Sequence, residues 1–330
     1  MLVLLLRVAN TLCERGSIDK SISCENENLS IIPSPERFPG YERVEWLELS
    51  GNKISIIDDD TFYGIFKSLK VINLNRNHLW KIKLNAFNNV PGLEELYLRK
   101  NNLFIGNKGL HSGCFKNLRK LRVLDLSENP LGLMPAYMFA PMSHLKVLRL
   151  ESIYPKIEFE EQCLSNLTGL EILSVTSNNL RSLPSYLEAS FYEMVQLKDL
   201  RLGDNPWECD CDLKWLVKWS KEAGMIGSDE PSCFGPRSLK EINIFSVDVD
   251  ELICRSNDVG EGNKTLIEIH PRSNVTLMCH FYGNPDGMKL RWYFNETKDY
   301  LPPGSKVNLK IVDFSTHTNL TLIRTLRSYI

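Results

Sequence analysis

The sequence has no long hydrophobic run and almost no net charge, and each absence excludes a class of function. Its longest wholly apolar start is Met1 to Leu6, which Arg7 interrupts, whereas a membrane-spanning helix needs about 20 apolar residues. The net charge is -2, from 39 Lys and Arg against 41 Asp and Glu, so no long-range field attracts a polyanion. We therefore expect no membrane span in these residues and no nucleic acid partner.

Motifs for catalysis and for cofactor binding are also missing. The six histidines are not grouped with cysteines or acidic residues at metal-ligand spacing. No phosphate-binding loop and no Ser-His-Asp order stands out in the sequence. We expect the chain itself not to be an enzyme and to bind no cofactor and no metal.

Cysteine, in contrast, is more frequent than is usual for a cytosolic chain. Nine cysteines, clustered at the ends of recognisable segments, favour an oxidising compartment. Six Asn-x-Ser/Thr sequons agree with an extracellular glycoprotein; they are at Asn28, Asn166, Asn263, Asn274, Asn295 and Asn319. Residues 1–12 are interpreted either as the remnant of a signal peptide or as a truncated start.

A single frame, L-x-x-L-x-L-x-x-N-x-L, recurs seven times in residues 44–204. The copies begin at residues 44, 69, 93, 121, 145, 170 and 197. That spacing is typical of leucine-rich repeats, and it predicts an α/β solenoid, a right-handed horseshoe with a parallel β-sheet on its concave face. Leucines at the fourth and sixth positions point inward, because side chains alternate along a strand.

The remaining recurrent positions of the frame are given structural roles. The asparagine at the ninth position satisfies backbone groups at the turn. Phe87, Phe115, Phe139 and Phe191 each lie six residues before a repeat start and predict a buried aromatic column on the convex side. Cys114 and Cys163 lie two coils apart, about 10 Å, too far for a disulfide, and we interpret them as buried thiols.

The fifth copy departs from the frame. Ile153 stands where the asparagine belongs, and Pro155 replaces the next leucine. We expect a local bulge in the solenoid here, with the region of Tyr154 as a candidate binding feature, because loops on rigid scaffolds often carry function.

Cysteine-containing segments flank the repeats, as a solenoid needs caps for its open ends. Cys13 and Cys24, in residues 13–43, resemble an extracellular N-terminal cap that lacks two of its usual four cysteines. Residues 205–256 resemble the C-terminal cap of such proteins, with Trp207 over the core and Asp212 as the expected cap of a helix that stops at Gly224. A zinc site is the rival interpretation, and the Cys-x-Cys spacing disfavours it.

The resemblance to this C-terminal cap implies its disulfide pairing, because spacing alone leaves three pairings open. The implied pairs are Cys209 with Cys233 and Cys211 with Cys254.

Residues 257–330 read as an all-β segment. Cys279 is followed 13 residues later by Trp292, the spacing of the B-strand cysteine and C-strand tryptophan of an immunoglobulin domain. No Tyr-x-Cys follows to supply strand F, so we expect a partial sandwich, truncated before that strand, in which Cys279 is unpaired.

Seven repeats, this cap and an immunoglobulin-type segment together resemble the LRR-Ig family of cell-surface proteins, the Kekkon, AMIGO and LINGO groups. The resemblance implies a single-pass membrane protein whose span lies beyond Ile330, at the cell surface or secreted, with an extracellular or cell-surface protein, or a second copy of the chain, as partner. The alternative is the N-terminal targeting arm of a larger enzyme, peroxidasin-like or a Trk-like receptor kinase, with its catalytic domain outside these residues.

The expected binding surface is the concave face, exposed at the third, fifth and seventh positions of each repeat. Aromatic and arginine side chains most often anchor interfaces, and the alternative for any one of them is an ordinary solvated strand residue. The candidates are Trp46, Glu48, Tyr97, Arg99, Asp125, Arg149, Glu151 and Arg201.

Overall fold

The computed structural model describes residues 13–15, 20–33, 43–63, 68–225 and 227–254, together with the backbone of five strands between residues 275 and 323. The chain divides into two compact units. The first comprises residues 1–209 and 215–247, and the second comprises residues 210–214 and 248–330. The segment 205–256, expected to be one cap, is therefore shared between the two units.

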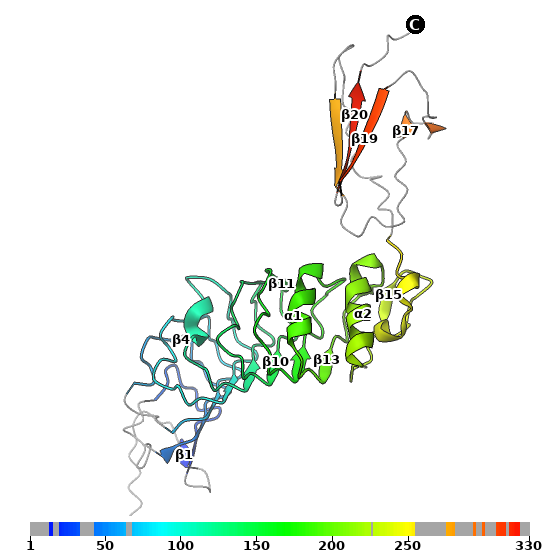
Figure 1. Ribbon diagram of the computed structural model, residues 1–330. Helices are drawn as coiled ribbons and strands as arrows, with labels where there is room; N and C mark the ends of the chain where they lie inside the picture. Colours follow the sequence, from blue (N-terminus) through cyan, green and yellow to red (C-terminus); the bar gives the residue numbers. More distant parts are fainter. Residues whose placement is uncertain are drawn as a thin grey trace, which may run out of the picture. The chain divides into compact units, whose positions relative to one another are not determined.

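A nine-stranded sheet forms the concave side of the first unit (Figure 1). Eight strands are parallel, and β1 at one edge is antiparallel to β2. In sheet order the strands are β1 (Glu14–Arg15), β2 (Ser21–Ser23), β3 (Trp46–Glu48), β5 (Val71–Asn73), β7 (Glu95–Tyr97), β8 (Val123–Asp125), β10 (Val147–Arg149), β12 (Ile172–Ser174) and β13 (Asp199–Arg201).

The repeat frame determines the strand register. Leu47, Ile72, Leu96, Leu124 and their successors pair directly from strand to strand and are fully buried. Because the side-chain period of a strand is two, fixing these residues inward fixes their neighbours outward. The outward side chains therefore form continuous rows across the sheet, one residue per coil.

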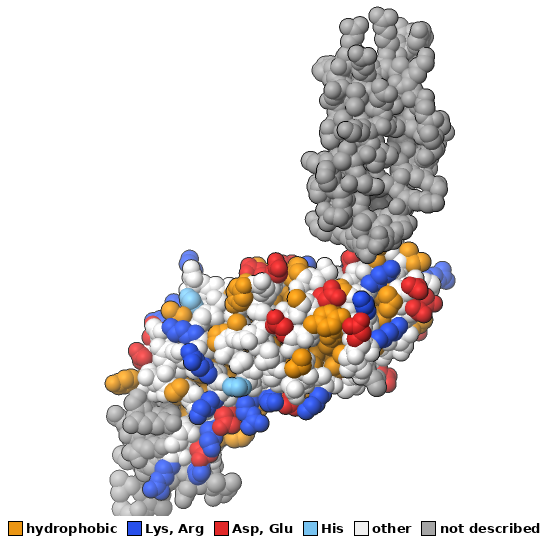
Figure 2. Space-filling view, in the orientation of Figure 1, with side chains coloured by type: hydrophobic (Ala, Val, Ile, Leu, Met, Phe, Trp, Pro, Cys, Tyr) orange, Lys and Arg blue, Asp and Glu red, His pale blue; other side chains and the backbone are white. Residues whose placement is uncertain are grey.

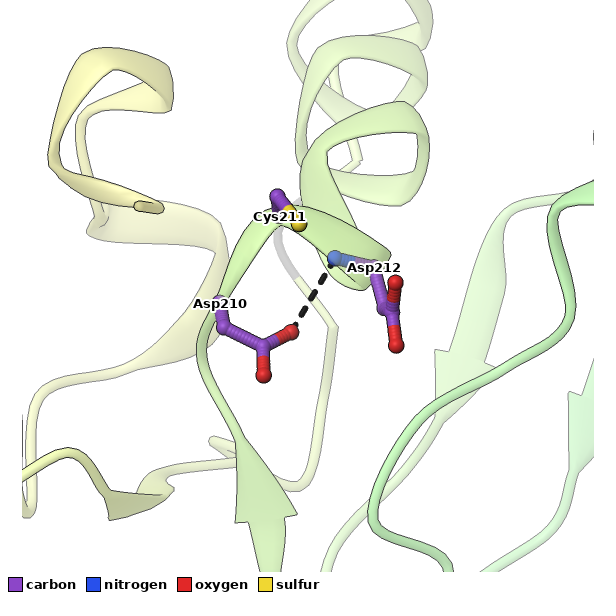
Figure 3. A group of neighbouring side chains, drawn as sticks. All are labelled: Asp210, Cys211 and Asp212. Atoms are coloured by element: carbon purple, nitrogen blue, oxygen red, sulfur yellow. Dashed lines mark hydrogen bonds between the residues drawn. The ribbon is translucent and has the colours of Figure 1, made fainter. Parts of the chain in front are cut away.

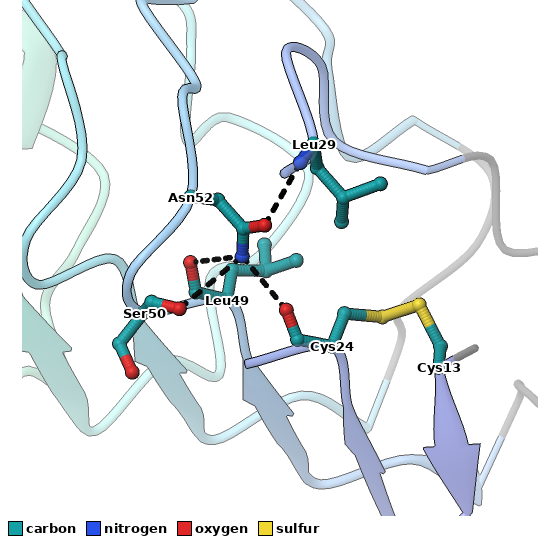
Figure 4. Close-up of a disulfide and its surroundings, with 6 residues drawn as sticks. All are labelled: Cys13, Cys24, Leu29, Leu49, Ser50 and Asn52. Carbon is teal, nitrogen blue, oxygen red and sulfur yellow. Dashed lines mark hydrogen bonds between the residues drawn. A yellow bond between two sulfur atoms is a disulfide. The ribbon is translucent and has the colours of Figure 1, made fainter. Parts of the chain in front are cut away.

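Buried asparagines join each coil to the one before it. The Asn52 amide donates to the carbonyls of Cys24 and Leu49 at 2.7 and 2.9 Å and accepts from the Leu29 amide at 2.9 Å (Figure 4). The same pattern recurs in later coils; its other members are Asn77, Asn101, Asn129, Asn178 and Asn205.

The residue before each ninth position has a left-handed backbone. Gly51 has φ +69°, and an added Cβ there would meet the Asn26 side chain. In the other coils this conformation is held by residues that adopt it at some cost; they are Asn26, Arg76, Lys100, Glu128, Ser152, Ser177 and Asp204. One sharp turn per coil thus directs the chain away from the sheet.

The convex side is filled by the predicted aromatic column. Phe87, Phe115, Phe139 and Phe191 are all buried, and Phe62 extends the column, stacking on Phe87 at 5.9 Å between ring centroids. The short elements outside the concave sheet are β4 (Ile56–Ile57) with β6 (Lys81–Ile82), β9 (Leu133–Met134) with β11 (Glu158–Phe159), and the helices η3 (Ser112–Phe115), η4 (Ser185–Leu187) and α1 (Glu188–Glu193).

The concave sheet passes through the fifth repeat in register. Strand β10 pairs in register with β8 and β12, and Ile153 is buried. The strands of this copy are thus regular, because strand pairing depends on the leucines, which this copy retains. The departure lies instead in the loop that carries Tyr154.

Disulfides hold both caps, and the two of the C-terminal cap have the pairing that the resemblance implied. The N-terminal cap holds Cys13–Cys24 beside the first strands (Figure 4). In the first unit Trp207 is fully buried, its indole N–H donates to the Leu202 carbonyl at 2.8 Å, and Cys209 bonds to Cys233. The elements here are β14 (Trp207–Glu208), β15 (Cys233–Gly235), α2 (Lys214–Ala223) and η6 (Ile244–Ser246).

The aromatic rings of the C-terminal cap close the end of the column. Phe191 meets Trp215 and Trp219 edge to face, at 5.2 and 5.0 Å between centroids. Helix α2 is followed by Gly224 at φ +65°, the helix-ending conformation that was expected for it.

The second unit contains the remaining cystine and two small sheets. Cys211 bonds to Cys254, near η5 (Cys211–Leu213) and η7 (Val249–Glu251). One sheet has the order β16 (Val275–His280), β20 (His317–Ile323), β19 (Asn308–Phe314), all antiparallel, and the other pairs β17 (Tyr293–Phe294) with β18 (Asp299–Tyr300).

Candidate protein-binding surface

The fifth positions of the repeats form one row across the concave sheet. Strand pairing places Glu48, Asn73, Tyr97 and then Asp125, Arg149, Ser174 and Arg201 in direct sequence. Five of the eight candidate residues therefore belong to a single row. Trp46 is in the row of third positions at 45% exposure, and Arg99 and Glu151 follow their strands at the seventh position.

Asp125 differs from the other candidates, because only 5% of it is exposed. Its carboxylate accepts from the Ser127 amide at 3.0 Å, and burial raises its pKa. The residue shapes the turn after β8 rather than offering a free carboxylate. Its outward position in the frame could not reveal this, because its burial depends on the side chains around it.

Tyr97 and the two arginines of the row are half-buried. The Tyr97 hydroxyl donates to Glu95 at 2.6 Å; burial and this carboxylate raise its pKa. Arg201 donates to Asp199 at 2.7 Å, while Arg149 has no ion pair within the described part of the chain. Tyr97 and Arg149 are thus an ordered aromatic and an available cation two strands apart.

A second row, which we name the charged row, runs along the residues that precede the strands. Backbone bonds of 2.7 to 2.9 Å link each member to the next. Its members are Lys20, Glu45, Lys70, Glu94, Arg122, Lys146, Glu171 and Lys198. Figure 2 shows acidic and basic side chains interspersed along the lower edge of the solenoid, where β10 and β13 lie in Figure 1.

Two glutamates of the charged row each bridge two lysines. Glu45 bonds to Lys20 and Lys70, and Glu171 bonds to Lys146 and Lys198, at 2.6 to 2.9 Å. These bonds lower the pKa of each carboxyl to about 2. The groups are solvent-exposed, so their effect is screened by salt.

Two open hollows lie where the concave strands end, and the sequence analysis missed most of the residues that line them. Their volumes are 320 and 730 Å³, and both are lined by Arg76, Lys100 and Glu128. All three have a left-handed backbone conformation. Their shared place in the repeat, one residue before the ninth position, was the signal that could have found them. Tyr154, singled out from sequence, lines the larger hollow.

Two sequons lie on described side chains. Asn28 and Asn166 are exposed, although the Asn166 amide donates to the Ala140 carbonyl at 2.7 Å. Asn263, Asn274 and Asn295 lie outside the described residues, as does the side chain of Asn319 in β20.

The acidic group at the start of the second unit is a helix cap. Asp210, Cys211 and Asp212 place their donor atoms within 4.8 Å of one another, but the Cys211 sulfur belongs to a disulfide. The Asp210 carboxylate accepts from the Asp212 amide at 3.0 Å (Figure 3). Asp210 is therefore the cap, and the prediction of Asp212 was wrong by two residues because a short η5 precedes α2.

Cys114 and Cys163 are buried and unpaired. Burial raises the pKa of both thiols, that of Cys163 to about 12. A nucleophilic role is disfavoured, because the thiolate is the reactive form. Across the described residues, no helix is both long and apolar enough to cross a membrane.

Stacked coils with inward leucines, an asparagine ladder and disulfide-bonded ends define the fold as a leucine-rich-repeat solenoid. The leucine-rich repeat family profile matches residues 35–103 and 108–152.

Particular relatives are similar to this chain in sequence. Trophoblast glycoprotein of Macaca fascicularis is 25% identical over 316 residues, covering 73% of this chain and 68% of the relative. Leucine-rich repeat transmembrane protein FLRT2 of Rattus norvegicus is 27% identical over 241 residues, covering 66% of this chain and 35% of the relative. The chain thus spans about a third of FLRT2.

A solved structure has the same fold. The crystal structure of human trophoblast glycoprotein, also named 5T4 and Wnt-activated inhibitory factor 1, superposes with a TM-score of 0.53. It is 23% identical, and the match covers 74% of this chain and 98% of that one.

Proposed function

We propose that this chain is an extracellular protein-binding module of a cell-surface adhesion or receptor protein, and that it binds its partner on the concave face. The observation that carries the proposal is the fifth-position row, in which Tyr97 and Arg149 project from strands fixed in register. Rigid strands hold such anchors at little entropic cost on binding, and tyrosine and arginine are common interface hot spots.

The compartment and the relatives support an extracellular role. Three disulfides in the described residues need an oxidising environment. The relatives are named a glycoprotein and a transmembrane protein. We accordingly propose a glycosylated, single-pass membrane protein, with Asn28 and Asn166 as the accessible sequons of the first unit.

We further propose that the second unit carries an immunoglobulin-type sandwich, which would make the chain a member of the LRR-Ig proteins. The sheet order β16, β20, β19 supports it, because strands B, E and D are neighbours in an immunoglobulin domain. The pairing of β17 with β18 has the position expected of C and C′. Cys279 lies in β16 as the B-strand cysteine would, and its lack of a partner stays a prediction.

The test is a screen followed by a paired substitution. The 330-residue chain, secreted as a multivalent fusion, is applied to an array of cell-surface ectodomains that includes the chain itself. For each partner found, the Kd is measured for the chain and for the double variant Tyr97→Ala with Arg149→Ala. We expect a loss of at least about tenfold, because two anchors of this type typically contribute more than about 1.4 kcal/mol.

The matched control removes the same residue types elsewhere. Tyr63→Ala with Arg119→Ala deletes an exposed tyrosine and an exposed arginine outside the concave strands, and should leave the Kd unchanged. Equal losses in the two double variants, or full affinity in the concave one, would overturn the concave face as the binding surface.

A further inference from the structure

The two hollows at the ends of the concave strands form one continuous, positively charged surface. Their shared residues are Arg76, Lys100 and Glu128. The smaller hollow adds Arg99 and the larger adds Tyr154. Two guanidinium groups and one ammonium group therefore accompany a single carboxylate among the lining residues, although the whole chain carries a net charge of -2.

The three cations differ in how they are held. Arg76 pairs with Glu25 at 3.0 Å, and Arg99 pairs with Glu128 at 2.6 Å. Lys100 is exposed and has no ion pair among the described residues. Its ammonium is the unneutralised charge of this surface.

The two existing ion pairs can be exchanged for others at little cost. The side chains of Arg76 and Glu25 are 57% and 45% exposed, and pairs between solvated side chains contribute little net free energy. A carboxylate supplied from outside can take the place of Glu25, since a guanidinium presents several donors in a fork that fits carboxylates. Beside it, the Lys100 ammonium needs no exchange at all.

Tyr154 gives the same surface an apolar contact. It is 49% exposed and lies in the loop where the fifth repeat abandons its asparagine for Ile153. An aromatic ring next to cations is the composition of an interface anchor. The loop in which the fifth repeat departs from the frame thus lines the larger hollow.

We propose that this surface binds an acidic loop of the partner protein, with carboxylates on Lys100 and Arg76 and an apolar side chain against Tyr154. The inference rests on the proposed function, since the smaller hollow includes Asn73 of the fifth-position row and so continues the concave face. Charge complementarity selects the partner's chemistry: the loop carries aspartate or glutamate and excludes basic segments.

The experiment uses a short cyclic peptide of alternating glutamate and glycine with one leucine, labelled for fluorescence anisotropy, and the full chain at low ionic strength. The same ring with glutamine in place of glutamate is the neutral comparison. We expect only the acidic peptide to bind. We expect Lys100→Gln to weaken its binding by up to about fivefold, as the loss of one solvent-exposed ion pair predicts. Tyr154→Ala should weaken it by a similar factor without changing its dependence on salt.

Lys120→Gln is the control, because Lys120 is exposed, lies outside both hollows and loses the same charge. Equal weakening by Lys100→Gln and Lys120→Gln would overturn the proposal, since it would mean that the chain attracts the peptide by its general charge and not at a specific site. It would also be overturned if a heparin oligosaccharide bound in a Lys100-dependent way and the peptide did not.

The peptide experiment is independent of the partner screen, because it needs no partner protein. If the screen finds a partner whose affinity depends on Tyr97 and Arg149 but the peptide does not bind, this inference alone is overturned. If the peptide binds in a Lys100-dependent way but the partner's affinity does not depend on Tyr97 and Arg149, the proposal that the fifth-position row binds the partner is overturned instead.

Discussion

Each buried asparagine of the ladder satisfies backbone groups in two coils at once. Asn101 donates to the carbonyls of Leu74 and Leu98, both at 3.0 Å, and accepts from the Leu79 amide at 2.9 Å. These backbone groups have no access to water, and an unpaired buried polar group is costly.

Replacing Asn101 with alanine should therefore be strongly destabilising. We expect the free energy of unfolding to fall by about 2 to 4 kcal/mol, since several buried backbone groups lose their partner, as measured by urea denaturation. Asn102→Ala makes the same change at the adjacent exposed position and should cost less than about 0.5 kcal/mol. Similar losses in both variants would contradict the structural role of the ladder.

At this scale the sequence was most informative where a residue has one task in every coil. The leucines and asparagines of the frame have constant surroundings, so their burial could be predicted from position alone. Asp125 and Asp210 could not be assigned in this way, because the burial of one and the capping role of the other depend on local neighbours. Arg76 and Lys100 were missed because their position is defined by backbone conformation, which tolerates many residue types.

Among the elements, the charged row gives the sheet a dependence on pH. The pKa of Glu171 is about 2 because its carboxylate bonds to Lys146 and Lys198. An unfolded glutamate has a pKa of about 4.3, so the folded state favours the ionised form. The resulting stabilisation is complete above pH of about 4.3 and disappears as the pH falls toward 2.

Glu171→Gln should flatten the stability profile in that pH window. Unfolding by urea, followed at successive pH values from 6 to 2, should show a smaller decline in the variant than in the parent chain. Glu161→Gln, at an exposed position without an ion pair in the described structure, should leave the profile as it was. A decline of the same steepness in Glu171→Gln and the parent would contradict the pairing.

The elements themselves were predictable in proportion to their periodicity. The concave strands follow from seven copies of one frame, whereas β4, β6, β9 and β11 have two residues each and carry no period to detect. The loop of the fifth repeat was located correctly by Ile153, but the intact register of β10 depends on its neighbours on either side.

At the scale of the whole molecule, the caps oppose unfolding that would begin at an open end of the solenoid. The bond between Cys209 and Cys233 closes a loop with a sequence separation of 24 beside the buried Trp207. Replacing both cysteines with alanine should lower the free energy of unfolding by about 3 kcal/mol. Tryptophan fluorescence during urea denaturation would measure the change, and an unaltered midpoint would show that packing alone holds the cap.

The in-register rows also set a spacing that any ligand must match. Neighbouring strands lie about 4.8 Å apart, whereas side chains on one face of an extended chain recur about every 6.7 Å. If an extended segment lay across the strands, its side chains would coincide with the rows only about once in every seven strands. Residues one turn apart on a helix rise by about 4.5 to 6 Å, which fits the rows far better. If the concave face binds as proposed, it therefore favours a folded partner over an extended segment, and a denatured partner is expected to lose affinity even with its sequence intact.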